Sequence, residues 1–105
     1  MASTAALRNA LLKRVAAQLA PMGFRLSEQT FGKRWRAGKL LVHLSFVRHT
    51  DDFDVLVDVA VRHDAIEDRL NADRPQLSKR ERAKTATVGV ELGNWSIGRP
   101  LRWTV

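Results

Sequence analysis

The segment from Lys39 to Arg62 constrains the fold most, because apolar and polar residues alternate along it. In its second half, five apolar residues share one parity: Phe53, Val55, Val57, Val59 and Val61. In its first half, four do so: Leu40, Val42, Leu44 and Phe46. Successive side chains of a strand point to opposite faces, so the pattern predicts two strands with one apolar face. The polar segment His49–Asp52 between them is short enough for a hairpin loop.

A helix is predicted before this hairpin, over about residues 4–20. Ser3 or Thr4 can cap its beginning, and Pro21 and Gly23 end it. Its apolar residues recur at spacings of three and four: Leu7, Leu11, Leu12, Val15, Ala16 and Leu19. Such a stripe needs an apolar partner, and we expect the helix to pack on the apolar face of the hairpin.

Three strands are expected in succession, over about residues 29–36, 39–48 and 53–62. The first continues an alternation that begins at Phe24 and is interrupted near Ser27–Gln29, so residues 24–36 predict one irregular strand. Ala37-Gly38 supplies the turn before the second strand.

The second half of the chain carries two capping-box spacings. Asp64 precedes Glu67 by three residues, and Ser78 precedes Glu81 by three. This spacing predicts short helical segments over 64–71 and 79–85. The remaining expectations are a fourth strand over 87–92, a turn at Gly93-Asn94, a loop at Gly98-Arg99-Pro100 and a short apolar end over Leu101–Val105.

These elements define the predicted fold class, a single α+β domain over residues 1–105. An N-terminal amphipathic helix packs on one face of an antiparallel meander sheet of four to five strands. A chain of 105 residues buries roughly two thirds of its unfolded surface, which is enough for one core. The absence of cysteine excludes disulfides and thiolate chemistry, and no apolar run is long enough to span a membrane. With no signal-peptide pattern, we expect a cytoplasmic location without a membrane partner.

The charge of the chain is positive overall and unevenly distributed. The formal net charge is +7, but residues 51–73 carry eight acidic and two basic residues. Basic residues dominate before and after this stretch. A basic protein attracts polyanions, while the acidic middle can also pair with the chain's own ends or with another protein.

Six short motifs follow one another in a recognisable order: Gly23-Phe24, Thr30-Phe31, Arg34-Trp35, Leu40–Phe46, Leu92-Gly93 and Arg102–Val105. Together with the preceding amphipathic helix, this order resembles a bacterial group catalogued as domain of unknown function 4304. The resemblance extends over most of the chain. It implies a helix-plus-sheet fold, and no activity or site residue is carried over from it.

The densest basic cluster includes an aromatic residue, a combination that suits phosphate contacts and base stacking. Its residues are Lys33, Arg34, Trp35, Arg36 and Lys39. A second basic run holds Lys79, Arg80 and Arg82, followed by Lys84. Both are candidate nucleic-acid-binding residues; the alternatives are a core or sheet-edge Trp35 and a solvated helix face at the second run. No Gly-rich phosphate loop accompanies them.

A candidate ligand or partner face lies on the polar parity of the hairpin and consists of His43, Ser45, Asp54 and Asp58. Imidazole and carboxylate groups can bind metals or transfer protons, but the three histidines lack the spacing of a single site. We therefore assign no catalytic residue, metal or cofactor. Trp95 and Trp103, with Leu101, are expected to pack in the core or at a sheet edge, or else to form an exposed aromatic patch.

Three functions remain open. We predict first a non-enzymatic interaction module that binds a protein partner or a second copy of itself, because the outer face is mixed and no catalytic constellation is present. The alternatives are binding of RNA or single-stranded DNA through the basic clusters, and an enzyme that uses His43 and the nearby aspartates.

Overall fold

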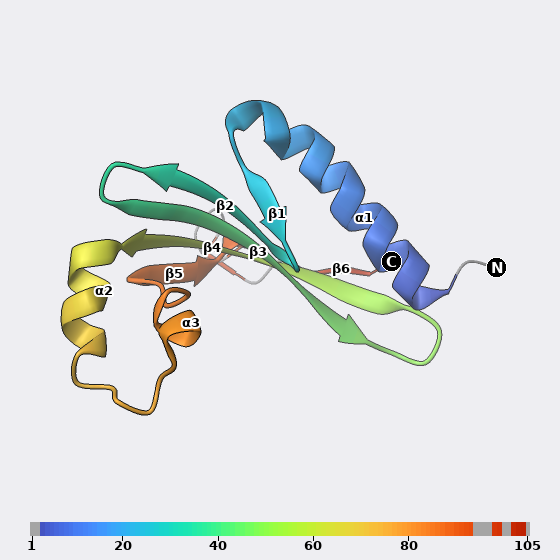
Figure 1. The fold of residues 1–105 in the computed structure, drawn as a ribbon. Helices are drawn as coiled ribbons and strands as arrows, with labels where there is room; N and C mark the ends of the chain where they lie inside the picture. Colours follow the sequence, from blue (N-terminus) through green and yellow to red (C-terminus); the bar gives the residue numbers. More distant parts are fainter. Residues whose placement is uncertain (1–2, 94–97, 100–101, 105) are drawn as a thin grey trace.

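The structure, a computed structural model, describes residues 3–93, 98–99 and 102–104. It confirms the α+β fold, with an N-terminal helix on one side of an antiparallel sheet (Figure 1). The elements in chain order are α1 Thr4–Leu19, a 3-10 helix Ala20–Met22, β1 Arg25–Ser27, β2 Thr30–Trp35, β3 Gly38–Arg48, β4 Phe53–His63, α2 Asp64–Asn71, α3 Lys79–Arg82, β5 Val88–Glu91 and β6 Trp103–Thr104.

The sheet is the predicted meander, with strand order β1-β2-β3-β4-β5. The short strand β6 adds to it by pairing with the beginning of β4, whereas β5 pairs with the second half of β4. The central hairpin is the longest pairing, since β3 and β4 each have 11 residues and pair along their whole length. Its turn is closed by the His49 N–H, which donates to the Asp52 carbonyl oxygen at 2.9 Å.

The core lies between α1 and the apolar face of the hairpin, as the sequence predicts. Its buried side chains are Leu12, Phe31, Leu44, Phe53 and Val55. Phe46 packs edge-on against Phe53, with 5.5 Å between the ring centroids. Full burial of one such side chain stabilises a fold by about 1.5–3 kcal/mol, so this small cluster is the main attachment of α1 to the sheet.

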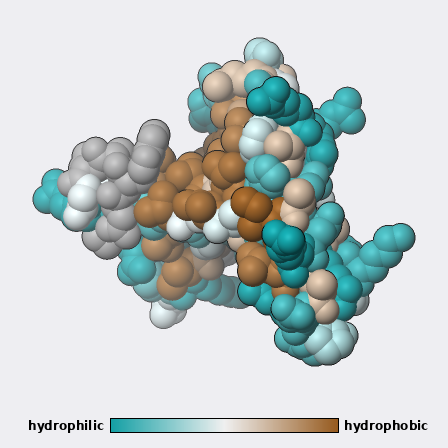
Figure 2. Space-filling view, turned by 90° about the vertical axis from the view of Figure 1, so that its left-hand side faces the viewer, coloured by the Kyte–Doolittle hydropathy of each residue, from teal (hydrophilic) through white to brown (hydrophobic). Residues whose placement is uncertain are grey.

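The helix covers only one half of the apolar face. Val61 is 40% exposed and its partner on β5, Val88, is 66% exposed. Figure 2 shows the end of the molecule on that side, where hydrophobic residues gather between hydrophilic ones. The predicted apolar parity is therefore correct, but the expectation that α1 packs on it holds only for the half that begins at Phe53.

The predicted irregular strand over residues 24–36 is wrong in one respect, because the structure divides it into two antiparallel strands. Ser27 pairs with Thr30 and Arg25 with Gly32. The backbone of Glu28, between them, has a φ of 57°, which lies in the left-handed region that tight hairpin turns require. The interruption near Ser27–Gln29 is thus a chain reversal, and it brings Arg25 beside β2.

The two capping boxes have different outcomes. At α3 the box forms as predicted: Ser78 Oγ accepts from the Glu81 N–H at 3.1 Å, and the Glu81 carboxylate accepts from the Ser78 N–H at 3.1 Å. At α2, the N-cap is His63, whose Nδ1 accepts from the Ile66 N–H at 3.4 Å. Asp64 is not the cap, because arginine side chains bind its carboxylate.

Some expectations fall outside the described residues. These concern Asn94, Trp95, Ile97, Pro100, Leu101 and Val105. Over residues 3–93, 98–99 and 102–104, no helix is both long enough and apolar enough to cross a lipid bilayer.

The close approach of the β2–β3 turn to the end of β4 gives a stability prediction. A Cβ added at Gly38 would overlap the carbonyl oxygen of Arg62, which is backbone and cannot rotate away. We expect Gly38→Ala to lower the free energy of unfolding by at least about 2 kcal/mol, measured by urea denaturation. Gly89→Ala is the control, because its Cβ would meet Ala60 at an ordinary 3.5 Å. Equal midpoints for the two variants would contradict this account.

Candidate anion-binding site

Three basic residues lie side by side across the sheet face that points away from α1. The strand register places Arg34 opposite Lys39, and Lys39 opposite Arg62. Like charges directly opposite one another on neighbouring strands are destabilising. The row therefore needs either an internal counterion or an external one.

Arg62 is the best-bonded member of this row. It is only 5% exposed, and its Nε donates to Asp64 Oδ1 at 2.8 Å. Its Nη1 donates to the carbonyl oxygens of Arg82 and Thr85, at 2.8 and 2.7 Å. These bonds attach the segment that follows α3 to the sheet.

Asp64 is the internal counterion for the end of this row. Its Oδ1 binds Arg62, and its Oδ2 accepts from Arg34 Nη2 at 3.0 Å. The hydrogen bond from Arg62, followed by the one from Arg34, lowers the pKa of Asp64. Two arginines thus share one carboxylate, while Lys39 between them makes no ion pair within the described residues.

Buried polar side chains hold α2 against the beginning of β5. Glu67 and Asn71 are each 2% exposed. The Thr87 hydroxyl donates to Glu67 at 3.0 Å, and Asn71 Nδ2 donates to Thr85 Oγ1 at 3.0 Å. This network, together with Arg62, fixes the position of the segment from α3 to β5 below the sheet, as Figure 1 shows.

A pocket of about 420 Å³ opens between the sheet and the segment after α3. We call it the basic pocket, because its lining holds six basic residues and one acidic residue: Arg25, Lys33, Arg34, Lys39, Arg62, Lys84 and Glu28. Gly32 and Leu41, which are paired on β2 and β3, also line it. Because Gly32 has no side chain, the sheet leaves a hollow at this point.

The positive charge of the basic pocket is only partly compensated by the chain. Asp64 binds Arg34 and Arg62, and Glu28 pairs with Arg80 of α3 at 3.5 Å. Three further basic side chains face the pocket and make no ion pair in the part of the chain that the structure describes: Arg25, Lys39 and Lys84. Lys33 lines the pocket from β2, but its side chain lies on the α1 side of the sheet, near Gly23. A concave, low-dielectric surface focuses the field of such charges, so the pocket favours an anionic ligand.

The structure brings together only some of the residues predicted to bind nucleic acid. Arg34 and Lys39 face the basic pocket, whereas Lys33 lines it from β2 with its side chain on the α1 side of the sheet, near Gly23. Arg80 lies beside it through its ion pair with Glu28. The side chain of Arg82 instead donates to two carbonyl oxygens of the preceding loop.

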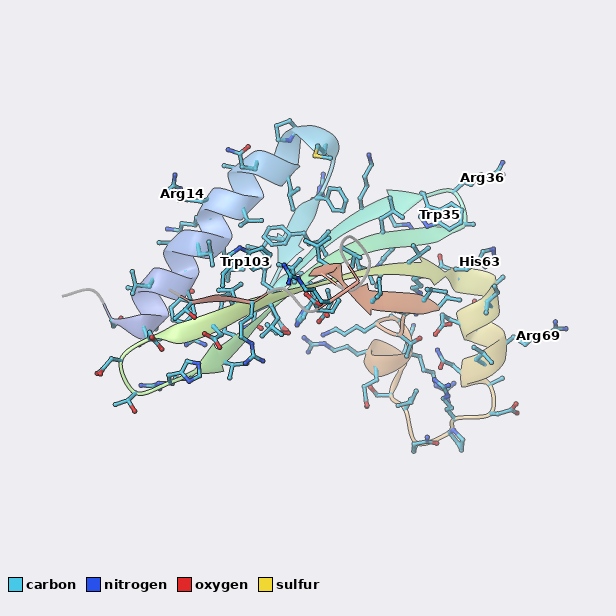
Figure 3. The ribbon with its side chains drawn as sticks, turned by 180° about the vertical axis from the view of Figure 1, so that it is seen from behind. Arg14, Trp35, Arg36, His63, Arg69 and Trp103 are labelled. Carbon is cyan, nitrogen blue, oxygen red and sulfur yellow. The ribbon has the colours of Figure 1, made fainter. Side chains whose placement is uncertain are left out.

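Trp35, Arg36 and Lys79 do not line the basic pocket. Trp35 shares the strand face of Phe31, which points toward α1, and it contacts His63 edge-on with 6.0 Å between the rings. In Figure 3, Trp35 and His63 lie close together, while Arg36 points outward from the tip of the β2–β3 turn. The aromatic member of the predicted cluster is therefore on the opposite side of the sheet from Arg34 and Lys39.

The predicted ligand or partner face is divided between two places. His43 lies opposite Thr30 and Asp58, and its Nδ1 is 2.8 Å from Thr30 Oγ1. Ser45, two residues along β3, lies opposite Leu56. This central part of the face could still bind a ligand through its polar groups.

Asp54 lies near the hairpin turn and is 6% exposed. It accepts from Thr104 Oγ1 at 2.7 Å and lies 3.0 Å from His49 and 3.4 Å from Arg102. The Thr104 hydrogen bond, followed by that of His49, lowers the pKa of Asp54. These contacts give Asp54 a structural role, the attachment of β6 to β4.

Catalytic and metal chemistry find little support in the described residues. No group of three or more histidine, cysteine, aspartate or glutamate side chains within them could hold a metal ion. Thr30 and His43 form a hydroxyl–imidazole pair, but a nucleophile of this kind also needs a third group that orients the base. Asp58 lies opposite His43, yet no hydrogen bond joins the two side chains in the described part of the chain.

The sequence signals missed Arg25 and Arg62 as members of this surface, whereas Lys84 belongs to the second predicted basic run. Arg62 lies at the end of a predicted strand and alternates with its apolar residues, which indicated only that its side chain faces away from the core. Its hydrogen-bond partners Arg82 and Thr85 lie 20 and 23 residues away in the chain, so no local pattern could reveal them.

No protein-family model, no curated protein and no solved structure matches the chain. The likeness to domain of unknown function 4304 stays a prediction, and any function must be argued from the surface itself.

The shared carboxylate of Asp64 gives a pH prediction. Because its pKa is lowered in the folded state, Asp64 stabilises the fold above the ordinary aspartate pKa of about 3.9, and this contribution disappears as the pH falls through the lower folded value. Asp64→Asn should therefore reduce stability at pH 7 and flatten the loss of stability below about pH 4. Thermal unfolding from acidic to neutral pH measures both effects. Asp51→Asn, in the exposed hairpin turn, is the control, and a variant that retained the wild-type acid profile would refute the role of Asp64.

Proposed function

We propose that this protein is a non-enzymatic binding module for single-stranded nucleic acid, RNA or DNA. The observation that carries the proposal is the convergence of five basic side chains on one pocket: Arg25, Arg34, Lys39, Arg62 and Lys84, from β1, β2, β3, β4 and the segment after α3. Lysine and arginine side chains bind phosphate oxygens and release counterions, which supplies most of the affinity of sequence-independent binding.

The arrangement of the charges favours a polyanion over an isolated anion. Arg25 comes from the edge strand, Lys39 from the centre of the sheet and Lys84 from the far wall. A single phosphate would contact only part of this set, whereas successive phosphates of a strand can contact all of it. The net charge of +7 adds a long-range attraction for such a ligand.

The size of the pocket favours an unpaired strand. Its volume of about 420 Å³ lies in the range of small-molecule sites and admits about one nucleotide unit at a time. A duplex is a stiff rod that presents its phosphates on a convex surface. A flexible strand can follow the hollow between Lys39 and Lys84, so we assign the pocket to a single strand.

The non-enzymatic part of the proposal rests on the contacts around the pocket. Arg34 and Arg62 are oriented by Asp64, and the lining holds neither a histidine nor a carboxylate other than Glu28. General acid–base work needs such a group within reach of the reacting atom, so binding is the chemistry that this surface supports.

A direct test is a fluorescence-anisotropy titration with RNA and single-stranded DNA oligonucleotides. With about four phosphate contacts, affinity should fall by roughly fiftyfold between about 50 and about 200 mM salt. Replacing Lys39 and Lys84 together by glutamine removes two contacts, and the fall should shrink to about sevenfold. Two basic residues away from the basic pocket supply the matched control, Lys13→Gln with Arg69→Gln; Figure 3 shows Arg69 pointing outward from α2. Salt-independent binding, or an equal effect of the control pair, would overturn the proposal.

The apolar half of the sheet that α1 leaves uncovered supports a second candidate function, self-association. Val61 and Val88 are neighbours there, and both are more exposed than core residues. Apolar surface of this kind is a common feature of contacts between protein chains.

Light scattering over a range of concentrations tests this candidate. If the Val88 surface joins two copies, the average mass should rise with concentration, and Val88→Lys should abolish the rise because it buries a charge in the contact. Val47→Lys is the control, since Val47 is also an exposed strand valine, at 40%, but lies on the opposite sheet face. A constant monomer mass would exclude self-association over the range measured.

A further inference from the structure

A second pocket, of about 450 Å³, lies between α1 and the edge of the sheet. We call it the polar pocket. It shares two lining residues, Glu28 and Thr30, with the basic pocket. Because the same two residues belong to both linings, the pockets meet at the β1–β2 turn. A strand whose phosphates lie in the basic pocket can therefore place a neighbouring group in the polar pocket.

One wall of the polar pocket is a planar cation on an aromatic ring. The Arg8 guanidinium carbon lies 5.8 Å from the centre of the Phe46 ring. Its Nε is buried and has no hydrogen-bond partner within the described residues. Unpaired bases stack on guanidinium planes in RNA-binding proteins, so the Arg8 side chain is a candidate stacking partner for a base.

Other lining residues carry groups that can hydrogen-bond the edge of a base. Asn9, next to Arg8 on α1, is exposed and lines the pocket with Gln29. Thr30 and His43 line the pocket from the sheet face that points away from α1, and the hydrogen bond between Thr30 and Nδ1 of His43 leaves Nε2 as the ring nitrogen for a ligand. Amide and imidazole groups offer both donors and acceptors, as base edges require.

The backbone of β3 adds a further donor and acceptor. The Leu44 N–H donates to the Gln29 carbonyl oxygen at 3.0 Å, across the edge that faces β2. Two residues on, the N–H and C=O of Phe46 point in the same direction, but β2 begins only at Thr30, so no strand among the described residues pairs with them. An open strand edge of this kind can hydrogen-bond a ligand.

The charge of the polar pocket differs from that of the basic pocket. Its lining holds one arginine and one glutamate, besides His43. With one positive and one negative side chain in the lining, these surroundings favour a phosphate less than the basic pocket does. They suit a planar, neutral, hydrogen-bonding group.

We propose that the polar pocket holds one unpaired nucleobase of the strand whose phosphates occupy the basic pocket. The inference rests on the proposed function and adds base recognition to it. Arg8 stacks on the base, and Asn9 and Gln29 bind its edge. The basic pocket supplies the electrostatic affinity, and the polar pocket distinguishes a base-bearing strand from a bare sugar–phosphate chain.

The test compares a single-stranded DNA oligonucleotide with an abasic strand of the same length, so that both carry the same charge. The wild-type protein should bind the base-bearing strand about tenfold more tightly, the effect of one stacked base. Arg8→Lys keeps the charge but removes the planar guanidinium. It should abolish this preference and leave the affinity for the abasic strand and the salt dependence unchanged.

Two further variants show whether a lost preference reflects a lost contact or a misfolded protein. Asn9→Ala changes an exposed side chain and should reduce the preference without affecting the fold. Arg14→Lys repeats the arginine-to-lysine change on the outer side of α1, where Figure 3 shows Arg14 pointing away from the sheet, and it should behave as wild type.

The outcomes distinguish a failure of base recognition from a failure of the proposed nucleic-acid binding. Equal wild-type affinity for both strands, or a preference that survives Arg8→Lys and Asn9→Ala, overturns base recognition while leaving phosphate binding in place. Failure of the wild-type protein to bind either strand overturns the proposed function itself.

Discussion

The buried guanidinium of Arg62 is the contact on which the rest of the surface depends. A buried cation is costly unless each of its polar groups has a partner, and removal of a partner from such a group destabilises a fold by about 3–5 kcal/mol. Arg62 meets this demand with the carboxylate of Asp64, a longer ion pair to Asp68 at 4.0 Å, and oxygen atoms of Arg82 and Thr85 in the segment after α3. By doing so it fixes this segment against β4, and the segment carries Lys84 to the wall opposite Lys39.

This arrangement accounts for the uneven charge of the chain. The acidic stretch that includes Asp64 and Glu67 is used inside the molecule, where Asp64 binds arginine and Glu67 binds the Thr87 hydroxyl. The lysines of the basic pocket gain no such partner within the described residues. Asp54 and Asp64 thus form ion pairs within the molecule, whereas Arg25, Lys39 and Lys84 face one concave surface without an ion pair to the described residues.

The sequence predicted the elements whose signals are local. The parity of the Lys39–Arg62 segment gave the hairpin and its faces, and the apolar stripe before it gave α1, because these patterns follow directly from strand and helix periodicity. The β1–β2 hairpin was not predicted, because Glu28 takes a left-handed conformation that its side chain does not signal. Asp64 was taken for a helix cap because its tertiary partner Arg34 lies 30 residues away.

The candidate site could be predicted only in part, for the same reason. Lys33, Arg34 and Lys39 are close in the sequence and remain close in the fold. Their union with Lys84 depends on hydrogen bonds of Arg62 that span 20 residues or more. Trp35 was grouped with its sequence neighbours, but strand alternation turns it to the opposite face, where it contacts His63. The polar pocket likewise joins α1 to β3, which no local pattern could bring together.

The most direct test of the central claim is a titration of the isotope-labelled protein with a single-stranded oligonucleotide, followed by amide chemical shifts. The account predicts that the largest shifts map to the walls of the basic pocket, at Arg25, Lys33, Lys39 and Lys84, with further shifts at Asn9 and Gln29. Shifts confined to the surface around Val61 and Val88, or no shifts at saturating oligonucleotide, would contradict it.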